Sequence, residues 1–174
     1  QQKGFVLVFR FSAQNDIKSS KNIIAAVSQA GLGLPDREYY LRDDEKFKTT
    51  RREYVAHLTK MFELAGVASA KAATDAERVM ALETELARAS MARVDQRKPE
   101  NTYHITAVSE LQSIAPQFQW PAFFTALGLG DLRSLNVAQP EYIREANRLL
   151  DEMPLETWKA YLRWNVLDAA APQL

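Results

Sequence analysis

A thirteen-residue segment, 29–41, constrains the fold of this chain more than any other part of its sequence. It reads Gln-Ala-Gly-Leu-Gly-Leu-Pro-Asp-Arg-Glu-Tyr-Tyr-Leu, with two glycines, a proline and two adjacent tyrosines. This order fits neither the two-residue period of a strand nor the 3.6-residue period of a helix interior. The segment therefore predicts a specified turn in which Gly31 or Gly33 takes a positive φ. We expect Pro35 at the first position of the helix that follows.

The residues before this turn predict a small β element. Residues 5–11 are β-branched and aromatic, and residues 22–29 read as a second extended segment. Residues 12–21, between them, are polar and typical of a turn. We expect an antiparallel two-stranded ribbon with a long connection. Because an isolated ribbon is marginal in water, it must lie on a helical body.

The residues after the turn predict helices. Apolar residues recur at helical spacing over residues 44–64, and Gly66 suits the end of that helix. Thr74 and Glu77 match a capping box, which predicts a helix from about 75 to 97 with Pro99 beyond its end. The remaining expected elements are helices over 108–115, 120–127, 140–153 and 155–170, and an extended segment over 135–138. The expected fold is mainly α, a single helical bundle-like domain over residues 1–174 with a small N-terminal antiparallel β ribbon.

The composition excludes several classes of function. Lys plus Arg equals Asp plus Glu at 22 each, so no charge excess points to a nucleic-acid partner. The absence of cysteine excludes disulfides, thiolate metal ligands and cysteine nucleophiles, but it does not identify the compartment. No apolar run reaches the ~18 residues of a membrane span. Since the chain begins Gln-Gln-Lys-Gly rather than with Met, we expect it to be a fragment of a longer protein.

The two histidines give little support to a metal site. His57 has no second histidine four residues on, so it is not part of a His-Glu-x-x-His zinc motif. His104 lies in a connector, where we expect it to bond to the backbone; a ligand or pH-sensing role is the alternative. A zinc site would need carboxylates from distant segments. We therefore assign no catalytic, cofactor-binding or metal-binding residue in this chain.

Two Gly-Leu-Gly segments, 31–33 and 128–130, suggest a phosphate-binding loop. The third glycine of a dinucleotide fingerprint would fall at Asp36 and Arg133, and neither is glycine. We therefore expect both segments to be backbone turns.

Other polar and aromatic residues have structural explanations. Glu83 and Glu85 are expected on solvated helix faces. An aromatic cluster is expected to be core rather than a stacking platform for bases; its members are Phe118, Trp120, Phe123 and Phe124.

The polar residues of the 29–41 turn have a structural and a functional interpretation. Acidic residues beside Arg37 suit a helix N-terminus, where the helix dipole favours them. Alternatively, Arg37, Tyr39 and Tyr40 tie the turn to a neighbouring domain or line a substrate chamber. His104 is a further candidate for such an interface or lining role.

Seven segments, in order, carry a family resemblance. They are 29–41, 54–66, 79–87, 101–104, 116–120, 161–164 and 168–172. From about residue 9 onward, the chain resembles the N-terminal region of the neprilysin and endothelin-converting-enzyme family of zinc metallopeptidases, in its bacterial form. The resemblance implies a two-lobed enzyme in which a large helical region caps a thermolysin-like catalytic domain and limits access to smaller peptides.

The same resemblance implies that the chemistry lies elsewhere in the parent enzyme. The family's zinc ligands and general base lie in a His-Glu-x-x-His helix and a later helix, neither of which this chain contains. We expect zinc in the parent, and as partners its catalytic domain and peptide substrates. We also expect self-association of the isolated fragment and a periplasmic or extracellular parent. The alternative is a free-standing helical interaction module without peptidase activity.

Overall fold

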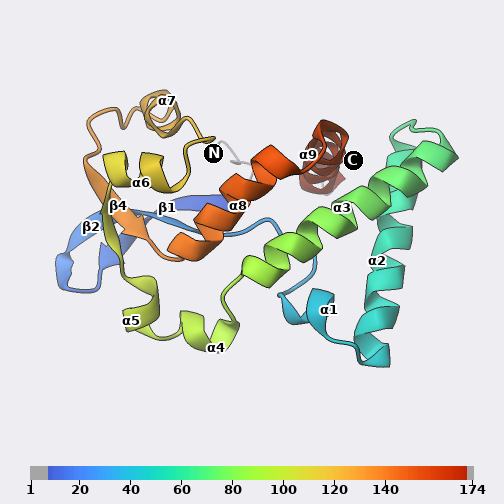
Figure 1. Ribbon diagram of the computed structural model, residues 1–174, viewed down its shortest axis with the longest axis horizontal. Coiled ribbons are helices and arrows are strands. Elements are labelled where there is room, and N and C mark those ends of the chain that lie inside the picture. The colour runs from blue at the N-terminus through green and yellow to red at the C-terminus, as the bar shows by residue number, and fades with distance from the viewer. Residues whose placement is uncertain (1–7, 172–174) are drawn as a thin grey trace. The chain divides into compact units, whose positions relative to one another are not determined.

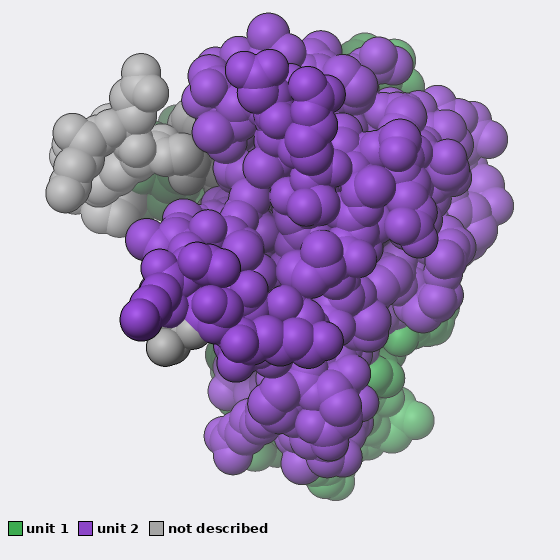
Figure 2. Space-filling model, turned by 90° about the vertical axis from the view of Figure 1, so that its left-hand side faces the viewer, with its two compact units in different colours: residues 1–7, 31–88, 153–174 green, residues 8–30, 89–152 purple. Residues whose placement is uncertain are grey.

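The computed structural model describes residues 8–171 and is mainly α-helical, as expected (Figure 1). The described residues form two compact units, which are coloured separately in Figure 2. Unit 1 comprises residues 31–88 and 153–171, and unit 2 comprises residues 8–30 and 89–152. No helix in the described range is long and apolar enough to cross a membrane.

Unit 2 contains a four-stranded mixed sheet. Its strands, in spatial order, are β1 (Phe9–Asp16), β2 (Ser19–Gln29), β4 (Ser134–Val137) and β3 (Ile105–Ala107). β1 and β2 are antiparallel, with Phe9 opposite Gln29. β4 runs parallel to β2, with Val27 beside Val137, and β3 is antiparallel to β4.

The predicted two-stranded ribbon with a long connection is therefore wrong in two respects. β1 and β2 do pair antiparallel, but they are half of a larger sheet that β3 and β4 complete, and these strands begin 76 and 105 residues after the end of β2. Their connection is also a tight turn at 17–18, in which the Lys18 N–H donates to Asp16 Oδ1 (2.9 Å). Apart from this turn, the polar residues that suggested a long loop belong to β1 and β2. The predicted start of the strand at residues 5–7 lies outside the described residues.

Short helices and one long helix complete unit 2. They are α4 (Arg93–Gln96), α5 (Pro99–Thr102), α6 (Val108–Ile114), α7 (Trp120–Ala126) and α8 (Pro140–Glu152). Phe9 and Phe11 of β1 make ring contacts with the predicted aromatic cluster, at centroid distances of 4.9 to 5.7 Å. Trp120 and Phe124 are fully buried there, which confirms the interpretation of this cluster as core.

Helices are the regular elements of the described part of unit 1, joined by turns. This unit contains α1 (Glu38–Leu41), α2 (Glu45–Leu64), α9 (Leu155–Ala170) and nearly all of α3 (Ser69–Ala89). α2 matches the predicted helix, and Gly66 follows it with φ of 85°, as expected for a C-terminal glycine.

α3 differs from its prediction at both ends. It begins at Ser69, so the proposed capping box lies inside the helix, where Thr74 Oγ1 donates to the Ala70 carbonyl (2.9 Å). Alanines at the start of the segment favour helix strongly enough to extend it past that motif. The helix ends at Ala89, and the residues expected to continue it form α4 instead, because Ala92 is extended (ψ 147°).

One buried carboxylate joins α3 to α9. Asp75 accepts from Lys71 (2.6 Å), from Arg78 (2.9 Å) and from Arg163 of α9 (3.3 Å). Its side chain is 1% exposed, so these three cations offset the loss of its hydration.

Candidate functional site

The 29–41 segment is a turn whose backbone is held from several sides. Gly31 has φ of 90°, which confirms the predicted positive φ, and its carbonyl accepts from Tyr161 Oη of α9 (3.0 Å). The expectation for Pro35 is wrong, because α1 begins three residues later at Glu38. Asp36 lies one position before the N-cap residue of that helix, and its Oδ1 accepts from the Glu38 N–H (2.9 Å).

A buried carboxylate, Glu83 of α3, holds this turn. Glu83 Oε2 accepts from Tyr40 Oη (2.6 Å) and from the Gly33 N–H (3.3 Å). Glu83 Oε1 accepts from Tyr54 Oη of α2 (3.1 Å). The turn, α1, α2 and α3 thus meet at one side chain, which is 1% exposed.

The prediction of a solvated Glu83 is therefore wrong. Glu83 lies four residues after Val79 and three before Leu86, so the helical period places it on the apolar face that α3 buries. The sequence does contain a signal for this site, because Glu83 interrupts the apolar stripe of its helix and the 29–41 segment offers two adjacent tyrosines as donors. Sequence periodicity alone could not identify the partners, which lie 29 to 50 residues away.

The electrostatics of this cluster follow from burial. Burial raises the pKa of Glu83 from 4.5 to about 7, although hydrogen bonds from Tyr40, Gly33 and Tyr54 favour the ionised form. Burial, and then the charge of Glu83, raise the pKa of Tyr40 and Tyr54 far above the physiological range. Both phenols therefore remain protonated donors.

Gly33 has no room for a side chain. A Cβ at this position would lie 1.9 Å from Tyr54 Oη and 2.7 Å from its Cζ. The second glycine of the turn is thus required by close approach, whereas the first is required by its φ.

The structure separates the two adjacent tyrosines. Tyr40 points into the Glu83 cluster and also accepts from the Leu34 N–H (2.8 Å). Tyr39 is half-buried, and its ring meets Phe47 edge to face at 5.1 Å. Arg37 is half-buried beside Glu38, with 3.7 Å between Nε and Oε1. Tyr39 and Arg37 therefore keep part of their surface accessible to a partner, as do the more exposed Pro35 and Glu38.

His104 belongs to unit 2 and is held by β4. Its N–H donates to Asn136 Oδ1 (2.7 Å), and its Nδ1 lies 3.2 Å from the Val137 carbonyl oxygen. These bonds confirm the predicted backbone-bonded connector histidine.

The donor set of the described residues does not fit zinc. Among residues 8–171 no three His, Asp or Glu side chains converge where they could hold a metal ion. His57 is exposed, with its ring edge-on to Trp164 at 5.7 Å. We therefore derive no catalytic step from these residues.

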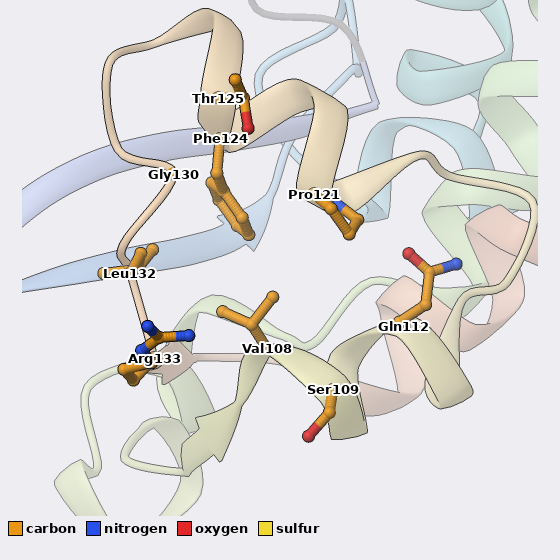
Figure 3. Close-up of a pocket in the computed structure, with 9 residues that line it drawn as sticks. All are labelled: Val108, Ser109, Gln112, Pro121, Phe124, Thr125, Gly130, Leu132 and Arg133. Carbon is orange, nitrogen blue, oxygen red and sulfur yellow. The ribbon is translucent and has the colours of Figure 1, made fainter.

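Unit 2 carries a surface pocket that sequence patterns did not reveal (Figure 3). Its volume is about 490 Å³, and α6, α7 and the loop between α7 and β4 form it. The lining residues are Val108, Ser109, Gln112, Pro121, Phe124, Thr125, Gly130, Leu132 and Arg133. The second Gly-Leu-Gly segment predicts a turn at this place but not a pocket. Gly128 turns the chain with φ of 73°, and Gly130 lines the pocket.

Comparison with known proteins gives one consistent result. The family model described as Peptidase family M13 matches residues 1–174. Endothelin-converting enzyme 1 of Rattus norvegicus is 29% identical over 158 residues, which cover 87% of this chain and 20% of the relative. The human enzyme is 28% identical over the same length, with the same shares. The chain thus spans about a fifth of the curated relatives that it matches.

Solved structures agree with this result. The chain matches the Mycobacterium tuberculosis zinc metalloprotease Zmp1 in complex with an inhibitor, with a TM-score of 0.90 and 33% identity. The match covers 98% of this chain and 26% of that one. PepO from Lactobacillus rhamnosis shares the fold, with a TM-score of 0.77 at 16% identity over 96% of this chain and 26% of PepO.

Proposed function

This chain belongs to peptidase family M13, within that family's N-terminal region, and we propose that it is a non-catalytic lid of a zinc metalloendopeptidase. In this proposal the lid shapes the parent enzyme's peptide chamber and restricts access to it. The zinc and the groups that cleave peptides belong to the parent's catalytic domain, which is the lid's partner.

The observation that carries the proposal is the family match over the whole length of the chain. Residues 8–171 bring together no group of donors that could hold zinc. Zmp1, a zinc metalloprotease, resembles this chain over 26% of its length. A parent enzyme in which the catalytic domain cleaves the peptide and this chain shapes the chamber would account for both facts.

Within the lid, the Glu83 cluster holds the 29–41 turn in one position. Tyr40 is the inward anchor, and the accessible Arg37 and Tyr39 are our candidates for contact with the catalytic domain or with peptides. His104 is a candidate of the same kind in unit 2.

The test uses the full-length parent enzyme and two peptide substrates that share a cleavage site but differ in length. We expect Arg37→Ala and Tyr39→Ala to change the ratio of kcat/KM between the long and the short peptide, with unchanged zinc content. Arg52→Ala, an exposed arginine on α2, is the matched control. An equal loss for both peptides, or no change for either, would contradict the lid role.

The coding sequence around the chain separates this proposal from a free-standing interaction module. An in-frame His-Glu-x-x-His downstream supports the lid, and a stop codon directly after Leu174 would contradict it.

We also propose that the isolated chain self-associates through α9. Leu155, Leu162 and Val166 are 67%, 43% and 51% exposed, and their spacings of seven and four place them on one face of α9. Sedimentation should show mass rising with concentration, and Leu162→Ser with Val166→Ser should reduce it. A strictly monomeric chain at high concentration would be inconsistent with this expectation.

A further inference from the structure

We propose that the pocket of unit 2 binds the carboxyl-terminal end of an apolar peptide. The lining chemistry carries this inference, so it does not depend on the lid proposal. Three features of the lining, in spatial order, match three parts of such a peptide end.

The first feature is an isolated positive charge. Arg133 is the only charged residue of the nine that line the pocket, and it forms no ion pair within residues 8–171. Its backbone is fixed, because its carbonyl accepts from the Val108 N–H at the start of α6 (2.9 Å). A guanidinium presents paired donors that fit a carboxylate, and no acidic side chain in the lining opposes an anion.

The second feature is an apolar middle. Val108 and Phe124 face each other across the pocket, and Leu132 and Pro121 flank them (Figure 3). Phe124 is 2% exposed and is locked into the aromatic cluster with Phe11 and Trp120, so this wall is rigid. The volume of about 490 Å³ lies within the range of roughly 300–1,000 Å³ typical of ligand pockets. An apolar side chain would fill this middle.

The third feature is an amide at the far end. Figure 3 shows Gln112 opposite Arg133, with its amide oxygen turned inward. Its Nε2 donates to the Pro116 carbonyl (3.2 Å), while its Oε1 is buried and accepts no hydrogen bond from the described residues. A buried acceptor without a donor is unfavourable, so a ligand N–H near this end would be stabilising.

The order of these features identifies the ligand class. A carboxylate, an apolar side chain and a backbone N–H follow one another at the carboxyl end of a peptide. A fatty acid offers the first two but not the N–H.

The experiment measures binding of N-acetyl-leucyl-phenylalanine to the 174-residue chain by calorimetry, beside its C-terminal amide. Loss of one exposed ion pair costs about 1 kcal/mol, so we expect the amide to bind roughly five-fold more weakly. Equal affinities, or no saturable binding of the acid, would overturn the proposal. Tighter binding of decanoate than of the peptide acid would overturn the peptide assignment.

Two variants separate the site from a general effect of charge or folding. Arg133→Gln should remove the preference for the acid, while Arg97→Gln, exposed in the same unit but outside the pocket, should retain it. Gly130→Phe should fill the pocket and abolish binding of both ligands. The fold can accept this change, because Gly130 has no positive φ and its Cβ would lie 3.4 Å from Thr125 Oγ1. A retained acid preference in Arg133→Gln, or undisturbed binding in Gly130→Phe, refutes the site.

Discussion

The chain contains the sequence Gly-Leu-Gly twice, at residues 31–33 and 128–130, and the two copies have different structural roles. In both, the first glycine turns the backbone, with φ of 90° at Gly31 and 73° at Gly128. The second glycines differ. A Cβ on Gly33 would lie 1.9 Å from Tyr54 Oη, whereas one on Gly130 would meet only Thr125, no closer than 3.4 Å.

The difference lies in the surroundings of each turn. Residues 31–33 lie against the buried carboxylate of Glu83. Its oxygens accept hydrogen bonds from Tyr40, Tyr54 and the Gly33 N–H. Residues 128–130 border an open pocket whose one charge, on Arg133, has no partner among the described residues. A polar cluster that is satisfied internally stabilises the fold, while an unsatisfied one at the surface is available to a ligand.

The largest expected effect is that of Gly33→Ala. The new Cβ must displace the Tyr54 ring, which overpacks the site and breaks a hydrogen bond to a buried carboxylate. We expect a loss of about 4 kcal/mol in the free energy of unfolding, measured by urea denaturation. A loss below about 1 kcal/mol would show that the close approach is not a constraint.

The next effect is a dependence of stability on pH that originates at Glu83. Burial raises the pKa of Glu83 to about 7 in the folded chain, against 4.5 otherwise, so the folded state binds this proton more tightly. The corresponding stability is fully present below pH 4.5 and is lost as pH rises through about 7, by about 3 kcal/mol in all.

Urea denaturation at several pH values, for the chain and for Glu83→Gln, measures this contribution. The variant should lose that part of the pH dependence. Glu77→Gln, on an exposed position of the same helix, is the matched control for removing a carboxylate. An identical pH profile for the chain and Glu83→Gln would disprove the assignment.

A smaller effect should distinguish the two tyrosines that hold Glu83. Tyr40→Phe removes a bond donated to Glu83 and one accepted from the Leu34 N–H, so we expect a loss of about 2 kcal/mol. Tyr54→Phe removes the longer bond to Glu83 and an interaction with the Trp164 side chain, and should cost about 1 kcal/mol. Thermal unfolding followed by circular dichroism ranks the two, and the reverse order would mean that Tyr54 is the main anchor.

The smallest effect is expected for Gly130→Ala. Its backbone needs no positive φ and its Cβ has room, so the change should stabilise by up to about 1 kcal/mol through a less flexible unfolded chain. The same denaturation assay compares it with Gly33→Ala. Similar losses at both positions would erase the contrast between the two turns.

Much of the fold could be predicted because it rests on local patterns. The apolar periods of α2, α8 and α9 identified these helices to within a residue or two, and Gly66 marked the end of α2. Predictions failed where distant segments compete with local signals. The capping motif at Thr74 was overridden by helix formers before it, and the polar stretch after Phe11 became strand because β2 pairs with it.

The candidate sites show the same limit more sharply. The backbone bonding of His104 was predicted correctly, because a connector histidine can bond to whichever backbone carbonyl lies beside it, and here Val137 of β4 supplies that carbonyl. Glu83 was misplaced because its surroundings depend on Tyr40, Tyr54 and Gly33, which no spacing within α3 reveals. The pocket that Arg133 lines lies between two helices and a loop, so it forms only when these three segments pack together.

The sequence by itself determined the mainly helical class, the need for a positive-φ glycine at position 31 or 33, and the family, through seven ordered segments. Each of these depends on chemistry or order along the chain. Only the tertiary structure decided that Gly33 must lack a side chain, that Glu83 is buried and that β4 lies beside β2. Those outcomes depend on atoms 21 to about 110 residues apart, because burial and close approach are properties of packed neighbours rather than of local sequence.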